Sequence, residues 1–164
     1  MLNEKIQAAF NDQINAELAS AYIYLSMAAW FNSRNLSGIA RWLQVQAQEE
    51  VEHAMKFFHF IDERLGQVEL KAIEGPRIDW DSPLDAFENV LGHEQYITGR
   101  INSLVDLAKA ENDHASLGFL QWFVKEQVEE EANADKVVQQ MRMIKDSPNG
   151  LFMIDHYMGK RGAD

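Results

Sequence analysis

The sequence of 164 residues contains no cysteine, which excludes disulfide bonds, thiolate metal sites, cysteine nucleophiles and iron–sulfur clusters. Only three prolines occur, so long stretches can stay helical without interruption. No apolar run is long enough to span a bilayer, and the first residues lack the charged-then-apolar order of a signal peptide. These absences predict a cytoplasmic protein with no membrane partner, and the length predicts one domain over residues 1–164.

Basic residues are scarce relative to acidic ones. The chain has 15 Lys and Arg against 26 Asp and Glu, and its formal net charge is −11. A chain this acidic does not attract a phosphate backbone by its overall charge, so we expect no nucleic-acid partner. Cations, in contrast, are attracted. The hydrophobic share of 46% and the charged share of 25% are typical of a folded domain.

Four long segments and one short segment have the apolar spacing of amphipathic helices. A candidate N-cap, Asn3, precedes the first segment, whose apolar stripe includes Tyr24 and Leu25. Gly66 fits the position just after the second helix, where a left-handed residue often ends a helix. The predicted helices cover about residues 3–32, 37–65, 83–110, 113–145 and 148–159.

The link between the second and third predicted helices is about 16 residues long, which is unusual for a loop without regular structure. Fully extended, it spans about 50 Å, whereas a helix of about 28 residues is about 42 Å long. The link can therefore run the full height of the molecule and make the third helix parallel to the second. The predicted fold class is all-α: a four-helix bundle with one long crossover between helices two and three, plus a short fifth helix.

Residues of the types that bind metal ions lie inside the apolar stripes of all four long helices. At about 100° per residue, each falls within about 60° of apolar neighbours on the core-facing side of its helix. In every helix, one of them lies roughly 17–21 Å from a helix end, near mid-height. We therefore expect the set to converge on one point. Its members are Glu17, Glu50, His53, Glu94, Gln127 and Glu130.

Four carboxylates at one buried point need compensation, because each unpaired buried charge costs several kcal/mol. No Lys or Arg lies on the predicted core faces to supply it. Either some carboxylates are protonated, or the site binds cations, and two divalent ions would neutralise four carboxylates. Oxygen ligands with one imidazole suit iron or manganese, and zinc is an alternative. A rotated stripe that exposes some of these acids is the remaining alternative.

At these separations, Glu17, Tyr24, Glu50-Val51-Glu52-His53, Glu94 and Gln127 with Glu130 resemble the ferroxidase site of bacterial non-haem ferritins. The resemblance covers essentially the whole chain. Gln127-x-x-Glu130 replaces the second Glu-x-x-His of the general di-iron pattern, which resembles true ferritins and differs from bacterioferritins. Val51 stands where bacterioferritins carry a haem-ligating methionine, so the resemblance implies no haem.

The resemblance implies a di-iron site with unequal metal positions. Glu17, Glu50 and His53 would hold the first iron. Glu50 would bridge to a second iron that is held by Glu94 and Glu130.

Further residues are assigned roles by the same resemblance. Gln127 would lie in or beside the ligand set and orient bound oxygen species, and Tyr24 would donate a hydrogen bond or an electron. A third iron site would lie nearer the inner surface, and a solvated acidic face is the alternative reading of its residues. The implied ligands of this third site are Glu49, Glu126, Glu129 and Glu130.

The implied function is iron storage with ferroxidase activity, in which iron(II) and dioxygen are the substrates and iron(III) is stored as a mineral. The partner is a further copy of the chain, in a hollow homo-oligomeric cage of two dozen subunits with closed symmetry. Apolar residues of the fifth helix and the crossover, Leu70, Ile78 and Trp80 among them, are expected at subunit contacts. A small di-iron oxidase and a metal buffer or structural cage holding zinc are the two alternatives.

Acidic residues also gather near the turn between the third and fourth helices. Asp106, Glu111 and Asp113 there could line a pore through which cations pass. We favour a solvated helix end as the interpretation of these residues, and the pore is the alternative.

Overall fold

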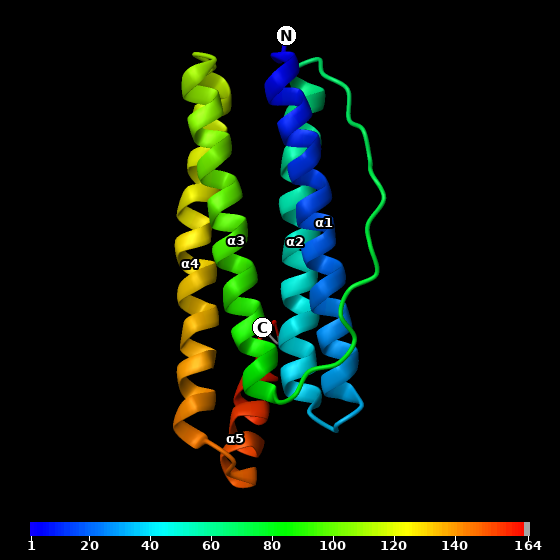
Figure 1. Cartoon of the computed structure of the whole chain (residues 1–164), viewed down its shortest axis with the longest axis vertical. Helices are drawn as coiled ribbons and strands as arrows, with labels where there is room; N and C mark the ends of the chain where they lie inside the picture. The colour runs from blue at the N-terminus through cyan, green and yellow to red at the C-terminus, as the bar shows by residue number, and fades with distance from the viewer. Residues whose placement is uncertain (163–164) are drawn as a thin grey trace.

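The computed structural model describes residues 1–162, and the secondary structure in that part of the chain is helical. Four long helices form the bundle, and a short fifth helix crosses one end of it (Figure 1). Two antiparallel pairs, α1 with α2 and α3 with α4, pack against each other, and α5 contacts α2 and α4. The helices are α1 (Glu4–Asn32), α2 (Ser37–Glu63), α3 (Pro83–Ala110), α4 (His114–Ile144) and α5 (Pro148–Met158).

Side-chain caps fix the start of most of these helices. The Asn3 side chain accepts a hydrogen bond from the backbone nitrogen of Lys5 at 2.9 Å, which confirms the predicted cap of α1. Ser82 and Asp113 cap α3 and α4 in the same way, and Pro83 occupies the first turn of α3. These bonds satisfy amide groups that a helix leaves free at its beginning.

The end of α2 differs from the prediction. The helix stops at Glu63, and Leu65, with φ of 58°, takes the left-handed conformation that we expected of Gly66. A Cβ atom at Gly66 would lie 2.7 Å from the side-chain oxygen of Gln7 and 2.9 Å from the side chain of Ile61. Both side chains would have to shift to admit a larger residue at this position.

One residue of the predicted α1 stripe lies on the wrong face. Leu25 is 49% exposed, whereas Tyr24 is fully buried. Consecutive helical residues point about 100° apart, so two neighbours cannot both lie at the centre of one stripe.

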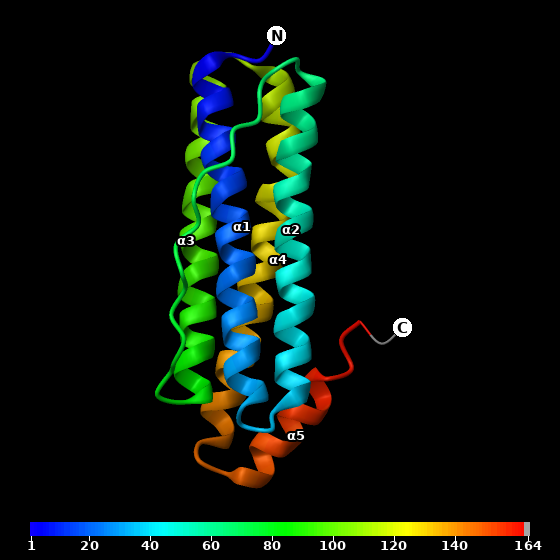
Figure 2. The ribbon, with the colours of Figure 1, turned by 90° about the vertical axis from the view of Figure 1, so that its right-hand side faces the viewer.

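The crossover runs the full height of the bundle along α1, as predicted (Figures 1 and 2). The Asn11 side chain holds its first part, donating to the carbonyl oxygen of Gln67 at 3.0 Å and accepting from the nitrogen of Glu69 at 3.0 Å. Trp80 secures the other end, packed 5.7 Å from the Trp30 ring and buried. Trp80 is therefore part of this chain's own core, which corrects its expected place on a subunit contact.

Two apolar clusters make up the core, and a layer of buried polar residues lies between them. One cluster lies toward α5 and contains Phe31, Leu43 and Phe87. The other lies toward the opposite end of the bundle and contains Phe10, Phe57 and other aromatic residues. This separation places the polar layer near mid-height. Within residues 1–162, no helix is long and apolar enough to cross a membrane.

Candidate metal centre

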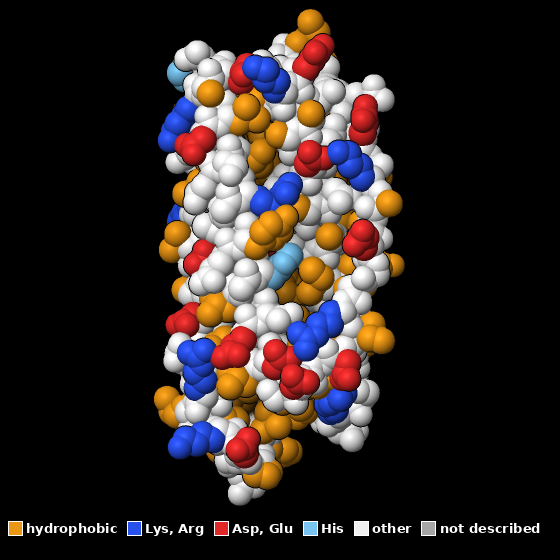
Figure 3. Space-filling view, viewed as in Figure 1, with side chains coloured by type: hydrophobic (Ala, Val, Ile, Leu, Met, Phe, Trp, Pro, Cys, Tyr) orange, Lys and Arg blue, Asp and Glu red, His pale blue; other side chains and the backbone are white. Residues whose placement is uncertain are grey.

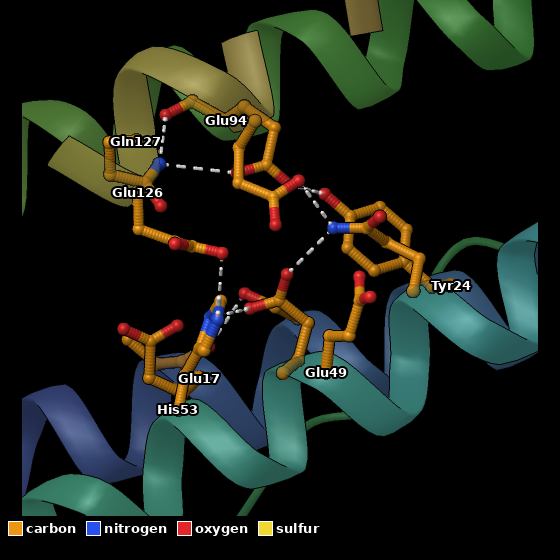
Figure 4. Close-up of polar contacts among 12 residues, drawn as sticks. Glu17, Tyr24, Glu49, His53, Glu94, Glu126 and Gln127 are labelled. Carbon is orange, nitrogen blue, oxygen red and sulfur yellow. Dashed lines mark hydrogen bonds and ion pairs between the residues drawn. The ribbon is translucent and has the colours of Figure 1, made fainter. Parts of the chain in front are cut away.

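The polar layer contains every member of the set expected to converge. Each of the six predicted side chains is at most 5% exposed, and each long helix contributes at least one of them. Figure 4 shows side chains from α3 and α4 facing those from α1 and α2 across a small gap. The six are Glu17, Glu50, His53, Glu94, Gln127 and Glu130, and Tyr24 and Gln46 are buried with them. The alternative of a rotated stripe is excluded, because all four acids are buried.

On the α1–α2 side, three side chains could hold one metal ion. Glu17, Glu50 and His53 each offer a ligand atom, and these atoms lie within 4.8 Å of one another. The Nδ1 atom of His53 lies 3.5 Å from a carboxylate oxygen of Glu50. One oxygen of Glu17 accepts a hydrogen bond from Gln13 at 2.8 Å, while the other is buried without any partner. A buried oxygen without a partner is costly unless a ligand occupies the gap beside it.

On the α3–α4 side, neutral donors hold the carboxylates. The Tyr24 hydroxyl donates to Glu94, and the Gln127 amide nitrogen donates to the Glu94 carboxylate at 3.2 Å. The Gln46 amide nitrogen donates to Glu130 at 2.8 Å and to Glu50 at 3.2 Å, so it joins the two sides of the site. None of these donors carries a charge, and they leave the negative charge of the carboxylates uncompensated.

Burial raises the pKa of these carboxyl groups. Loss of hydration, with the neighbouring Glu50 charge, raises the pKa of Glu17 to about 8. Loss of hydration and the charge of Glu94 raise the pKa of Glu130 to about 7. The pKa values of Glu50 and Glu94 are raised by burial as well. Without metal, the site therefore holds protons near neutral pH, and divalent cations would displace them.

The residues suggested for a third site fall into two groups. Glu126, His53 and Glu130 have ligand atoms within 4.8 Å of one another, with Glu126 4.0 Å from the Nε2 atom of His53. Glu49 and Glu129 instead line a neighbouring cavity of about 490 Å³. The structure thus brings Glu126 to the edge of the buried site and leaves Glu49 and Glu129 beside it.

The acids considered for a cation pore are paired with other side chains. Glu111 accepts hydrogen bonds from Asn3 and Lys5 at 2.9 and 2.7 Å. The Asp113 side chain caps α4, and its two carboxylate oxygens accept hydrogen bonds from the two terminal guanidinium nitrogens of Arg64, at 3.1 and 3.0 Å. These contacts favour the helix-end interpretation at this turn.

Sequence reasoning did not single out the amides that support the site. Gln13 precedes Glu17 by four residues, and Gln46 precedes Glu50 by four, so each amide lies one turn from the carboxylate to which it donates. This repeated spacing was visible in the sequence. The contact of Arg161 with Gln46 could not be predicted in this way, because Arg161 lies beyond α5 and only the tertiary fold brings it to the site.

A family model described as a ferritin-like domain matches residues 7–144. The chain therefore belongs to the ferritin-like family. Within it, the chain is 41% identical to a bacterial non-heme ferritin of Bacteroides fragilis, with 98% of this chain and 100% of that protein covered. It is 35% identical to a bacterial non-heme ferritin of Staphylococcus aureus, with 100% and 99% covered. These relatives confirm the resemblance to bacterial non-haem ferritins.

The fold class is confirmed by a solved structure. The open pore ferritin of the hyperthermophilic archaeon Archaeoglobus fulgidus matches with a TM-score of 0.97 at 50% identity. The match covers 98% of this chain and 99% of that chain.

Proposed function

We propose that this chain is an iron-storage protein that oxidises iron(II) with dioxygen at a site inside each subunit and keeps the iron(III) as a mineral within a cage. One observation carries the proposal. Four long helices bury carboxylates together. Among residues 1–162 no lysine or arginine forms a salt bridge with them, His53 is the one imidazole beside them, and one oxygen of Glu17 lacks a partner. In a member of the ferritin-like family, iron is the cation that fits this need.

Two iron(II) ions bind as substrates in this proposal. Glu17, Glu50 and His53 bind the first, and Glu94 and Glu130 bind the second. Glu50 bridges the two positions in this proposal, and the donation of Gln46 to both Glu50 and Glu130 supports that role. Each ion gives up one electron, and dioxygen accepts both. A site of negative carboxylates favours this step, because it stabilises iron(III) more than iron(II).

The neutral donors have supporting roles in the same proposal. Tyr24 and Gln127 both donate to Glu94 and hold it in place beside the second iron position. Direct coordination by Gln127, and electron donation by Tyr24, stay predictions from the resemblance. Glu49, Glu126 and Glu129, with Glu130, stay predicted ligands of a third iron site on the path to the interior.

Storage requires a cavity, which a single four-helix bundle does not enclose. Large apolar side chains are exposed on α5 and the crossover, including Leu70, Ile78, Phe152 and Met153. Figure 3 shows apolar side chains at the surface among charged groups of both signs. Exposed apolar surface of this kind is typical of subunit contacts. The exposed apolar surface supports self-association, and the resemblance to ferritins implies the form that we propose, a closed homo-oligomeric cage of two dozen subunits.

Aerobic loading with excess iron(II) tests the function, followed by size exclusion with protein and iron detected on the same column. We expect iron far in excess of a few ions per chain, co-eluting with a very large particle. A small species with about two irons per chain would contradict the storage function and favour the alternative of a small di-iron oxidase. A large particle that binds iron(II) without consuming oxygen would contradict ferroxidase activity and favour the alternative of a metal buffer.

A further inference from the structure

The chain segment after α5 turns back beside α2 (Figure 2). Its Arg161 side chain brings one cation to the edge of the buried site, where it contacts Gln46. The Arg161 guanidinium donates to the Gln46 side-chain oxygen at 2.9 Å and to the Glu49 carboxylate. It also lies over the Trp42 ring, with its central carbon 4.4 Å from the ring centre. Three groups of α2 therefore bind one side chain from the tail.

Separate contacts hold this tail in place. Arg41 donates to the backbone oxygens of Arg161 and Gly162 at 3.1 and 2.9 Å. α5 is fixed on the start of α2, where the Asp155 carboxylate accepts a hydrogen bond from the backbone nitrogen of Ile39 at 2.8 Å. The position of Arg161 thus depends on tail contacts that do not involve its own side chain.

Arg161 and Glu49 lie on the wall of the same cavity as Glu129. The cavity lies where α2 faces α4, and these two helices are more widely separated than α1 and α3. Arg161 also connects to the buried carboxylates, because Gln46, with its oxygen turned to the guanidinium, presents its amide nitrogen to Glu50 and Glu130. A guanidinium only donates hydrogen bonds, which fixes this orientation of the amide.

We propose that Arg161, held in place by the C-terminal tail, competes with metal ions for the Glu49 carboxylate. A divalent metal ion can then bind at Glu49 only by breaking this ion pair and displacing the tail. The inference rests on the proposed function, because it assumes that the adjacent buried carboxylates bind metal. Arg161 keeps Glu49 neutralised while the buried site fills, and it gives way when a third ion competes for the same carboxylate. The tail then sets how many ions each subunit binds before metal moves to the interior.

Zinc binding by isothermal titration, with the assembled protein, tests this inference without oxidation chemistry. The wild type should bind two zinc ions per chain tightly and a third weakly. In Arg161→Ala, the third ion should bind about tenfold more tightly, because it no longer has to break the charged contact between Arg161 and Glu49. Arg161→Lys, which keeps the charge, should restore weak binding of the third ion.

Three further variants exclude a general effect of charge or folding. Arg142→Ala also removes one positive charge, from an exposed pair with Glu88, and should leave the third ion weakly bound. Arg161→Ala combined with Glu49→Gln should lose the gain seen with Arg161→Ala alone. Arg41→Ala, which loosens the tail and leaves the Arg161 side chain intact, should tighten the third ion to a smaller extent.

The outcomes separate this inference from the proposed function. Two tight zinc ions in the wild type, with a third that is equally weak in Arg161→Ala, would overturn the role of Arg161 alone. A gain that persists in the double variant would also overturn it, since Glu49 would not be the ligand concerned. Absence of the two tight ions from the wild type would overturn the proposed function itself.

Discussion

The aromatic cluster toward the free end of the bundle and the polar layer beside it are equally buried, yet burial has opposite effects on them. Phe57 packs 4.4 Å from Phe123 and 5.1 Å from Phe10, measured between ring centres. Removal of such side chains from water contributes about 1.5–3 kcal/mol each. In the polar layer, burial instead raises the pKa of Glu17 and opposes its ionised form. The difference shows that the two apolar clusters stabilise the bundle and that the polar layer serves another purpose.

The largest expected effect on stability comes from the aromatic cluster. Phe57→Ala should lower the free energy of unfolding by about 3–5 kcal/mol, because it leaves a cavity among packed rings. Denaturant unfolding of the metal-free protein measures this loss. The exposed Val128 provides a control, since Val128→Ala should change the free energy little. A loss below about 1 kcal/mol for Phe57→Ala would show that the cluster is not the main source of stability.

The polar layer should show the reverse pattern, a loss of activity without a loss of stability. Glu50→Gln should slow rapid iron(II) oxidation about 100-fold, equivalent to about 2.7 kcal/mol of activation free energy, because it removes the charge between the two iron positions. Stopped-flow absorbance measures the rate, and denaturant unfolding should show no destabilisation of the metal-free variant.

Glu52→Gln is the matched control for that change. Glu52 is exposed on the same helix and belongs to neither group of clustered ligand atoms. Its variant should oxidise iron(II) at the wild-type rate. An unchanged rate in Glu50→Gln, or an equal slowing in both variants, would contradict the assignment of the site.

The raised pKa values predict how the stability of the metal-free protein depends on pH. Glu17 changes from an ordinary pKa of 4.5 to about 8 in the folded protein, and Glu130 from 4.5 to about 7. Between these values the folded state binds more protons than the unfolded state, so the contribution of both groups is complete below about pH 4.5 and is lost by about pH 8. Thermal unfolding at pH 5 to 8 should show this decline, and zinc should suppress it. A melting temperature that does not fall over this range in the absence of metal would contradict the protonated site.

The smallest effect is expected from an ion pair on the surface. Arg142 and Glu88 lie 2.7 Å apart with both side chains about half exposed. Arg142→Ala should change the free energy of unfolding by less than about 1 kcal/mol, since water screens such pairs. Unfolding at low and high salt measures the change. A loss comparable to that of Phe57→Ala would show that surface charge contributes as much as the apolar clusters.

Assembly gives a further comparison between the bundle and α5. Deletion of residues 148–164 removes the exposed apolar side chains of α5 and should weaken the cage while the four long helices remain folded. Light scattering measures the size of the particle, and circular dichroism measures the helix content. An unchanged particle would show that α5 is not needed for assembly.

The fold could be predicted almost completely from the sequence, because helix period, caps and the length of the crossover are local or additive properties. Leu25 was assigned to the apolar stripe although its neighbour Tyr24, about 100° away, is the buried residue, and the left-handed residue that ends α2 is Leu65 and not Gly66. The proximity of the Gln7 side chain to Gly66 is a tertiary contact, and no local pattern reveals it.

Burial of the four carboxylates at one height could be predicted as well, since each lies in an apolar stripe at a known distance from a helix end. The hydrogen-bond partner of each carboxylate could not be predicted from the sequence. The contact of Arg161 with Glu49 depends on how α5 packs against α2 and where the tail then turns.

A crystal structure of the protein soaked anaerobically with iron(II), recorded at the iron absorption edge, tests the central claim most directly. We predict two anomalous peaks per subunit in the polar layer, one contacted by Glu17, Glu50 and His53 and the other by Glu94 and Glu130. Iron bound only at surface acids, with the polar layer lacking an anomalous peak, would contradict the account.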